Sequence, residues 1–285
     1  MTATPKLAGG AWVAEAPLTR ARRLSFGRAH WRGLLAIAVF VLVWQVGADT
    51  GLVGGGKLAS PLQAFSVLVA NYLGNPNYWE GWLVSLQRVL SGFLIAQVIG
   101  IPLGILFGIS RRIREIVFPV FEILRPIPPL AWVPLSILFW PTAESSIVFI
   151  TTLGAFFIIV INVFDGVRTI PGVYLWQARS LGAGGWAIVR RIYLPALMPA
   201  IAAGMTLGIT VTWNVLIAAE MIASNSGLGR LTWEGYVSGT SAVVIVGMIS
   251  IGVAGALSSA AIGWLERRLT PWAQEARRRS QAGGR

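Results

Sequence analysis

The chain of 285 residues contains no cysteine and a single histidine, His30. Without cysteine it can form no disulfide, no thiolate metal site and no thiol nucleophile. A single histidine excludes a histidine-based zinc site, and its place in a basic N-terminal segment argues against a Ser-His-Asp triad. We therefore predict no catalytic residue and no metal ligand in this chain.

Charged residues are also scarce, at 12% of the chain, whereas a soluble domain carries about 25%. Hydrophobic residues make up 55%. The net charge of +12 would suit a nucleic-acid-binding protein, but the basic residues cluster between hydrophobic runs and at both ends. That distribution is typical of a protein embedded in the lipid membrane. We expect no nucleic-acid partner.

Six runs are apolar enough to cross a bilayer, which takes roughly 20 residues of helix. The third run is interrupted by prolines. The composition thus predicts an all-α membrane protein with six transmembrane helices. The predicted spans are about 33–53, 83–109, 116–140, 146–165, 194–222 and 242–265.

Basic residues fall on one side of these spans. Nineteen of the 23 lie in the N-terminal and C-terminal tails and in the loops that follow spans two and four, whereas only Lys57 and Arg230 lie on the other side. Positive charge marks the cytoplasmic side of a membrane protein. Both termini are therefore predicted to be cytoplasmic, with basic tails at 1–32 and 266–285. The N-terminal segment lacks the apolar core of a signal peptide.

The segment 54–82 is predicted to be periplasmic, and its part from 58 onward is too polar to span. We expect a short amphipathic helix there on the outer surface. Its aromatic residues would lie at the membrane interface. They are Tyr72, Tyr78, Trp79 and Trp82.

Two stretches imitate nucleotide-binding motifs. Gly51–Leu58 follows the phosphate-binding loop pattern, but Leu58 lacks the hydroxyl that would hold magnesium. Gly182–Ala187 imitates a dinucleotide fingerprint, but no buried strand precedes it. We expect a turn at the first stretch and no ATP site in this chain.

The cytoplasmic segment 173–195 is large for a connector between spans four and five. A helix, a glycine bend and a second helix would make it a compact surface knob, and an ordinary interfacial loop is the alternative. Gly182 permits a tight bend, and Pro195 suits the start of the next span.

The spacing within this segment resembles the signature loop of binding-protein-dependent ABC importer permeases, EAA-x3-G-x9-I-x-L-P. Trp176, Gln177 and Ala178 stand at the EAA positions, so the sequence departs there from Glu and Ala. Further segments, such as SLQRVLSGF and EILRPIPPLAWVPLSILF, resemble the nitrate/sulfonate/taurine branch over about 58–272. The resemblance implies that the segment forms a coupling helix, at about 173–186, seated in a groove of an ATPase. The coupling residues implied are Trp176, Gln177, Ala178, Arg179, Leu181, Gly182, Ala183, Ile192, Leu194 and Pro195.

That family implies a type I (MetI-like) permease fold, with a core permease domain at 83–265, in a multi-pass protein of the bacterial inner membrane. It implies a separate ABC ATPase in two copies, which binds ATP and Mg, a periplasmic substrate-binding protein and a second permease copy. The chain itself would bind no cofactor and catalyse no reaction. The cargo would be a small, anionic solute such as a sulfonate, taurine or nitrate.

Polar residues inside spans usually face a cavity or a partner. In span three they accompany broken backbone, which is tolerated where it lines a cavity. In span five they form one helical stripe. Structural ion pairs, kinks and helix–helix hydrogen bonds are the alternatives. The residues predicted along the translocation path are Arg88, Glu122, Arg125, Pro129, Trp132, Thr206, Thr210, Trp213, Asn214 and Glu220.

Glycines at 100, 104 and 108 repeat every four residues, which favours close helix packing. The main alternative for function is an ion-coupled secondary transporter that works without an ATPase. It would predict internal repeats with broken helices in matching positions, and the sequence shows no convincing repeat.

Overall fold

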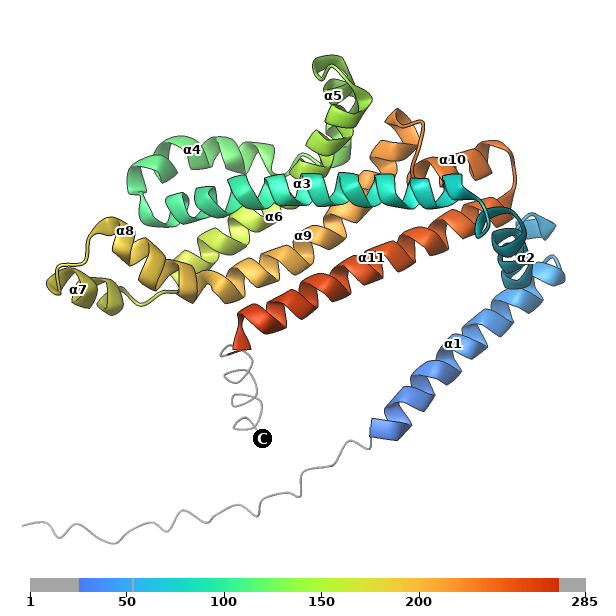
Figure 1. Ribbon diagram of the computed structural model, residues 1–285, viewed down its shortest axis with the longest axis horizontal. Helices are drawn as coiled ribbons and strands as arrows, with labels where there is room; N and C mark the ends of the chain where they lie inside the picture. Colours follow the sequence, from blue (N-terminus) through green and yellow to red (C-terminus); the bar gives the residue numbers. More distant parts are fainter. Residues whose placement is uncertain (1–25, 53, 272–285) are drawn as a thin grey trace, which may run out of the picture.

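The computed structural model describes residues 26–52 and 54–271, and every regular element within these ranges is a helix (Figure 1). Most of the predicted tails 1–32 and 266–285 lies outside the described residues. In chain order the helices are α1 (Phe26–Asp49), η1 (Gly54–Gly56), α2 (Pro61–Val67), η2 (Leu68–Tyr72), α3 (Pro76–Ile109), α4 (Arg111–Leu124), η3 (Pro129–Trp132), α5 (Val133–Phe139), α6 (Ala143–Arg168), α7 (Gly172–Ser180), α8 (Gly185–Ile188), η4 (Val189–Tyr193), α9 (Leu194–Ala223), α10 (Leu228–Val237) and α11 (Ser241–Leu269).

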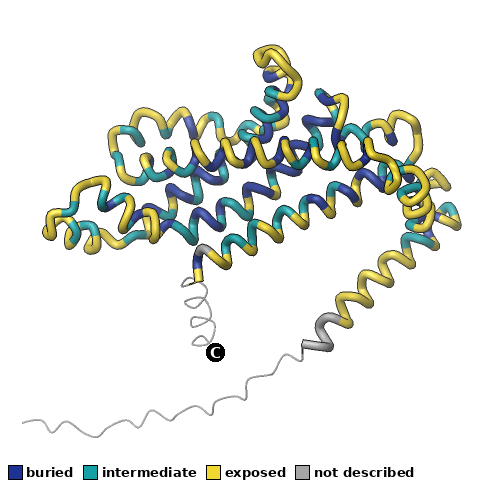
Figure 2. Tube along the Cα trace, viewed as in Figure 1, coloured by how far each residue is buried: buried dark blue, intermediate teal, exposed yellow. Residues whose placement is uncertain are grey.

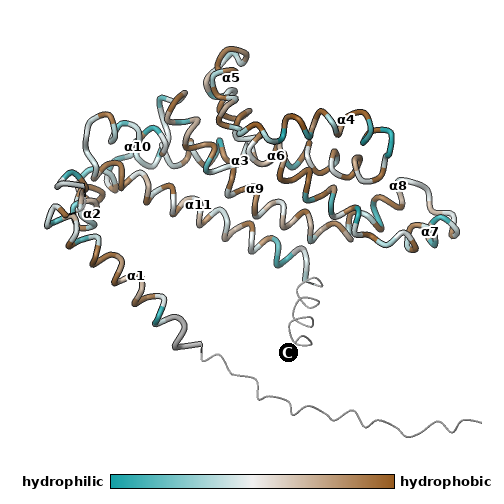
Figure 3. Tube along the Cα trace, turned by 180° about the vertical axis from the view of Figure 1, so that it is seen from behind, coloured by the Kyte–Doolittle hydropathy of each residue, from teal (hydrophilic) through white to brown (hydrophobic). Residues whose placement is uncertain are grey.

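Five of the described helices are long and apolar enough to cross a membrane. They are α1 from Trp31, α3, α6, the continuous helix Gly185–Ala223 that joins α8, η4 and α9, and α11. Figure 3 shows the apolar residues along these helices. A sixth span arises if α4 and the η3–α5 segment are taken together, with a bend of 88° between them. The described helices thus provide five spans, or the six predicted ones when the broken pair is counted as the third.

The break follows from the prolines after α4. Pro126, Pro128 and Pro129 have no N–H to donate to a helical carbonyl, and α4 ends at Leu124 just before them. Pro134 follows in the same proline-rich stretch but interrupts no helix. It lies in the first turn of α5. Backbone N–H groups in a first turn have no helical hydrogen-bond partner, so proline costs no hydrogen bond there.

The centre of the bundle is formed by α3, α6 and α9, which hold most of the buried residues (Figure 2). Glycines of α3 allow its backbone to approach α6 closely. A Cβ at Gly100 would lie 3.1 Å from Cγ2 of Ile159, and one at Gly104 would lie 2.8 Å from Cβ of Val163. The predicted packing role of these glycines is confirmed.

Helix α1 diverges from this bundle (Figure 1). Its contact with the rest of the described chain is mainly through the turn at η1 and helix α2, where the Gln45 side chain accepts a hydrogen bond from the Leu62 amide (3.2 Å). Only 11% of its apolar membrane-spanning stretch is buried against the rest of the described chain. The exposed apolar surface of α1 therefore suits contact with lipid or with another protein chain.

The second predicted span, 83–109, lies within a longer helix. Helix α3 begins at Pro76, because the Asn75 side chain caps it by accepting from the Asn77 amide (3.0 Å) and proline suits a first turn. The predicted surface helix is consequently limited to α2 and η2. Tyr78 is buried rather than interfacial, and its hydroxyl lies 2.7 Å from that of Ser250.

The two ends of the bundle differ in charge. Figure 1 places the α3–α4 turn, α7 and α8 at one end, which we call the basic end because it carries Arg111, Arg168, Arg179 and Arg190. Helices α2 and α10 and the start of α3 lie at the opposite end. There Gly51–Leu58 forms the expected turn, with left-handed φ at Gly51, Gly54, Gly55 and Gly56.

Candidate functional site

The segment between α6 and α9 folds as a helical hairpin at the basic end, and we call residues 172–193 the knob. Helix α7 ends at Ser180 with Leu181 as its C-cap, and Gly182 follows with φ +79°, a left-handed conformation that favours glycine. The amide of Ala183 donates to the carbonyl of Ala178 (3.0 Å), and that of Gly182 to the carbonyl of Arg179 (2.9 Å). This is the Schellman arrangement that ends a helix, so the glycine bend predicted between two helices is confirmed.

The knob has an inner and an outer face. Ala178, Ala183 and Ile192 are partly buried against the main core. On the outer face Trp176 is 74% exposed, Leu181 is 88% exposed and the neighbouring polar residues are open to solvent. The remaining predicted residues, Gln177, Arg179, Leu194 and Pro195, are also exposed.

One outer-face residue was missed from the sequence. Trp186 is 77% exposed. Trp176, Leu181 and Trp186, spaced five residues apart, are the three large apolar side chains of this hairpin with the greatest exposure, at 74% or more. Exposed apolar groups of this kind mark a protein–protein contact when they lie outside the membrane. That spacing in a polar loop was the signal available from the sequence.

The predicted path residues separate into two groups, and the first lines surface cavities at the broken span. One cavity of about 540 Å³ includes Glu122 and Arg125, which form an exposed ion pair (3.3 Å), and also Arg114 and Arg168. A second cavity of about 540 Å³ includes Arg125, Pro129 and Thr210. Arg125 is common to both, so the two cavities meet at the break between α4 and η3.

Two more predicted path residues have accessible side chains. Trp132 lines a separate cavity of about 390 Å³ beside α5, and Asn214 is exposed on α9. Thr206 is half-buried, and its hydroxyl donates to the Glu266 carboxylate of α11 (3.4 Å).

The second group is buried inside the chain, so these side chains line no open cavity in this structure. Trp213 is buried beside Gly255 of α11. Arg88 is 3% exposed and Glu220 is 0% exposed, and they pair with each other. The helical stripe predicted on α9 is therefore divided: Thr210 faces a cavity, whereas Trp213 and Glu220 face neighbouring helices of the same chain.

Glu220 is the centre of a buried polar cluster at the end opposite the knob. Its carboxylate accepts from the Ser85 hydroxyl (2.8 Å), from the Arg88 guanidinium (2.8 Å) and from the Gly229 amide at the start of α10 (2.8 Å). The Ser85 oxygen also accepts from the Leu228 amide (2.9 Å). Two free amides of the α10 N-terminus are thus satisfied by this cluster, as helix termini require.

Arg88 extends the cluster to two further segments. Its Nε donates to the Glu144 carboxylate in the first turn of α6 (2.8 Å), and a second guanidinium hydrogen bond reaches the same carboxylate. Its Nη1 donates to the Ser226 carbonyl (2.9 Å). The Glu144 side chain is 63% exposed, so one guanidinium joins a buried carboxylate to an exposed one.

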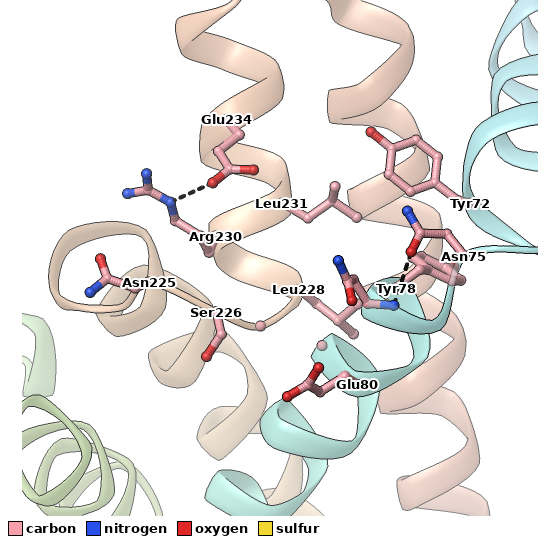
Figure 4. Close-up of a pocket in the computed structure, with 13 residues that line it drawn as sticks. Tyr72, Asn75, Tyr78, Glu80, Asn225, Ser226, Leu228, Arg230, Leu231 and Glu234 are labelled. Carbon is pink, nitrogen blue, oxygen red and sulfur yellow. Dashed lines mark hydrogen bonds and ion pairs between the residues drawn. The ribbon is translucent and has the colours of Figure 1, made fainter.

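A cavity of about 380 Å³ lies beside this cluster, between α10 with its preceding loop and the start of α3 (Figure 4). Figure 4 shows Arg230 and Glu234 on α10, paired at 2.9 Å, across from Tyr72 and Asn75. Partial burial and then the charge of Glu234 raise the pKa of the Tyr72 hydroxyl, so it stays protonated and can donate. We call this space the outer cavity.

Metal-binding groups do not gather in the part of the chain that the structure describes. Within residues 26–52 and 54–271, no three His, Asp or Glu side chains lie close enough to hold an ion.

Comparison with known proteins gives a consistent result. Residues 100–271 match the family model described as the binding-protein-dependent transport system inner membrane component. The chain is 40% identical to a putative ABC transporter permease protein of Methanocaldococcus jannaschii, covering 70% of this chain and 75% of that one. It is 33% identical to the nitrate import permease protein NrtB of Leptolyngbya laminosa (83% and 87% covered). It is 32% identical to the taurine transport system permease protein TauC of Escherichia coli K12 (90% and 92% covered).

The fold is also similar to a solved one. A structure of the MetNI methionine ABC transporter in an inward facing conformation superposes with a TM-score of 0.61. The match covers 70% of this chain and all of the solved chain, at 22% sequence identity. At that identity the likeness concerns the fold alone, and it agrees with the predicted MetI-like arrangement.

Proposed function

This chain belongs to the binding-protein-dependent ABC importer permeases of the inner membrane, in the nitrate/bicarbonate/taurine/sulfonate branch, and on that premise we propose that it carries a small anion and is driven through its knob. Such a permease works with an ATPase and a binding protein. The proposal adds two copies of the permease around a central path, two copies of the ATPase, and ATP with Mg bound by the ATPase alone. The observation that carries it is the apolar outer face of the knob.

The chemistry of the knob suits docking to a protein. Trp176, Leu181 and Trp186 expose apolar surface at the basic end, which faces the cytoplasm by the positive-inside rule. Water makes such exposure unfavourable, whereas burial in a groove of the ATPase stabilises the complex. Tryptophan is also enriched among the residues that dominate interface energies.

The knob is connected directly to two membrane-spanning helices, so a movement of the knob moves them. Its second half, α8 and η4, continues without a break into α9, so that Gly185–Ala223 is one helix of 39 residues. Its first half follows α6 after a short turn. ATP binding brings the two ATPases together, the seated knobs follow, and α6 and α9 tilt so that the path opens outward. Hydrolysis returns it to the inward-open state.

An anionic cargo is supported by the cavities at the broken span. Arg114, Arg125 and Arg168 line them against two acidic residues, Glu122 and Asp165, which leaves a positive balance. A guanidinium binds the oxygens of nitrate, carboxylate or sulfonate groups well. The curated relatives include permeases named for nitrate and taurine import. Arg125, at the junction of both cavities, is the residue we assign to contact with the cargo.

The docking role is tested by a polar substitution on the outer face. Leu181→Asp places a charge where the ATPase groove is apolar, and we expect affinity for the ATPase to fall about thirtyfold, the effect of losing about 2 kcal/mol at an interface hot spot. Because Leu181 is exposed, the permease should insert and fold normally. The measurement is co-purification with the ATPase, followed by titration of ATPase activity.

The matched control is Leu52→Asp. Leu52 is equally exposed, at 83%, but lies in the turn at the opposite end. This variant should bind the ATPase as the unmodified chain does. Equal ATPase binding by Leu181→Asp and the unmodified permease would refute the docking role.

A further inference from the structure

The cluster around Arg88 and Glu220 has no part in docking the ATPase or in contact with cargo. The side chains of Arg88 and Glu220 are nevertheless almost completely buried, at 3% and 0% exposure. A buried ion pair contributes little net stability, because the loss of hydration offsets the attraction, and its better-attested effect is to fix one geometry. The question is therefore which segment of the chain this cluster holds in place.

The hydrogen bonds identify that segment as residues 224–231, which link α9 to the first turn of α10. Arg88 binds its Ser226 carbonyl, Glu220 binds its Gly229 amide and Ser85 binds its Leu228 amide. Each of these three side chains belongs to α3 or α9, so the segment is tied to both helices at once. We call residues 224–231 the outer cap.

Two positions of the outer cap must be glycine because the backbone there lies very close to α9. Gly227 has φ +108°, and a Cβ there would lie 2.6 Å from Cδ of Glu220. At Gly229 a Cβ would lie 2.6 Å from the Ile217 carbonyl oxygen. The outer cap can therefore reach its position only with glycine at both places and the carboxylate between them.

The outer cap is also a wall of the outer cavity. Asn225, Ser226, Arg230 and Leu231 line that cavity from one side, and the start of α3 lines it from the other (Figure 4). The cavity is polar and open at the end of the molecule that faces away from the cytoplasm. That end is the side from which a binding protein approaches.

The cluster lies at the far end of the helix that starts in the knob. Glu220 is in the last turn of the continuous helix Gly185–Ala223. A tilt of that helix driven at the knob must move Glu220, and the cluster then moves the outer cap with it. Knob and outer cap are thus joined by one helix and one buried ion pair.

We propose that Arg88 and Glu220 are positioning residues that hold the outer cap on α3 and α9, so that the outer cavity has the shape on which the loaded binding protein docks. The inference rests on the proposed function for the identity of the docking partner. The placement of the outer cap itself does not depend on that function. The two statements are therefore tested by separate measurements.

The placement is tested by the mobility of a spin label, for which this cysteine-free chain is well suited. A label on Asn225→Cys reports on the outer cap, and one on Asn77→Cys reports on the opposite wall of the cavity. In the purified complex in nanodiscs, adding Glu220→Gln should make the label at 225 markedly more mobile and leave that at 77 unchanged. Equal mobility at 225 with and without Glu220→Gln would overturn the positioning role.

The docking consequence is tested by ATPase activity of the same complex. It is titrated with the cognate binding protein, loaded with nitrate in one series and with taurine in another. For Glu220→Gln we expect the half-saturating concentration of binding protein to rise about tenfold, with the maximal rate and the rate without binding protein unchanged. A loss of maximal rate at an unchanged half-saturating concentration would indicate a merely structural role and contradict the inference.

Two further variants keep the test decisive. Glu115→Gln makes the same chemical change in an exposed pair with Arg111 and should alter neither parameter.

If Glu220→Gln does not assemble, Ser85→Ala replaces it, since it removes only the hydroxyl that bridges Glu220 and Leu228. Ser85→Ala must then shift the half-saturating concentration and the mobility at 225 in the same direction, and no shift would overturn the inference. If neither loaded form stimulates the unmodified complex, nitrate and taurine are excluded as the cargo, and label mobility alone decides the positioning role.

Discussion

At the scale of single residues, the space around a glycine decides what a substitution does. Gly104 and Gly252 both lie inside transmembrane helices, and their sequence neighbourhoods are equally apolar. A Cβ at Gly104 would lie 2.8 Å from the Val160 carbonyl oxygen and 2.8 Å from Cβ of Val163, whereas nothing lies within 4 Å of one at Gly252. The first glycine therefore sets the distance between α3 and α6, and the second one does not.

Gly104→Ala should consequently destabilise the permease by about 1–3 kcal/mol, the usual effect of overpacking a tight core. The expected observation is a lower midpoint of thermal unfolding in detergent, with unfolding monitored by intrinsic tryptophan fluorescence. Gly252→Ala is the matched control, with a midpoint at or slightly above that of the unmodified chain because alanine favours helix. Equal midpoints for both variants would show that α3 and α6 are not in close contact.

At the scale of elements, the break between α4 and η3 determines where a charge can face the cargo. The 88° bend lies at Arg125–Pro128, and the backbone there leaves helical geometry beside two cavities. Non-helical backbone at membrane depth is tolerated where it lines a cavity. The Arg125 side chain is about half-exposed and only weakly engaged with Glu122, at 3.3 Å, so it remains available to an anion.

Arg125→Glu should reduce uptake of nitrate or taurine into proteoliposomes about tenfold or more, because it replaces attraction of the anion by repulsion. Arg125→Lys keeps the sign of the charge and should retain most of the uptake. Arg111→Glu reverses a charge that is 83% exposed at the basic end and serves as the control. Docking of the ATPase should be the same in all three variants, and undiminished uptake by Arg125→Glu would remove Arg125 from the path.

At the scale of the whole molecule, the spans and their orientation were predictable because the bilayer imposes them. It demands about 20 apolar residues per helix and retains arginine on one side. The knob was predictable from one glycine and one proline at a fixed spacing. These signals are local, or they concern one helix at a time.

Contacts between distant helices were not predictable in the same way. Arg88 and Glu220 read as polar residues at membrane depth, which suggests a path, but their partner in each case lies 132 residues away. The same limit applies to the start of α3, where the Asn75 cap and the Tyr78–Ser250 contact outweighed the polar composition of 76–82. A single sequence shows which face of a helix is polar but not what covers that face.

The central claim is that the knob is where the ATPase seats, and site-directed cross-linking tests it most directly in this cysteine-free chain. Leu181→Cys and Leu52→Cys are each labelled with benzophenone maleimide in the assembled transporter and irradiated. The account predicts a covalent product between permease and ATPase from position 181 and none from position 52. A permease that cross-links to the ATPase from position 52, or from neither position while the complex remains assembled, would contradict it.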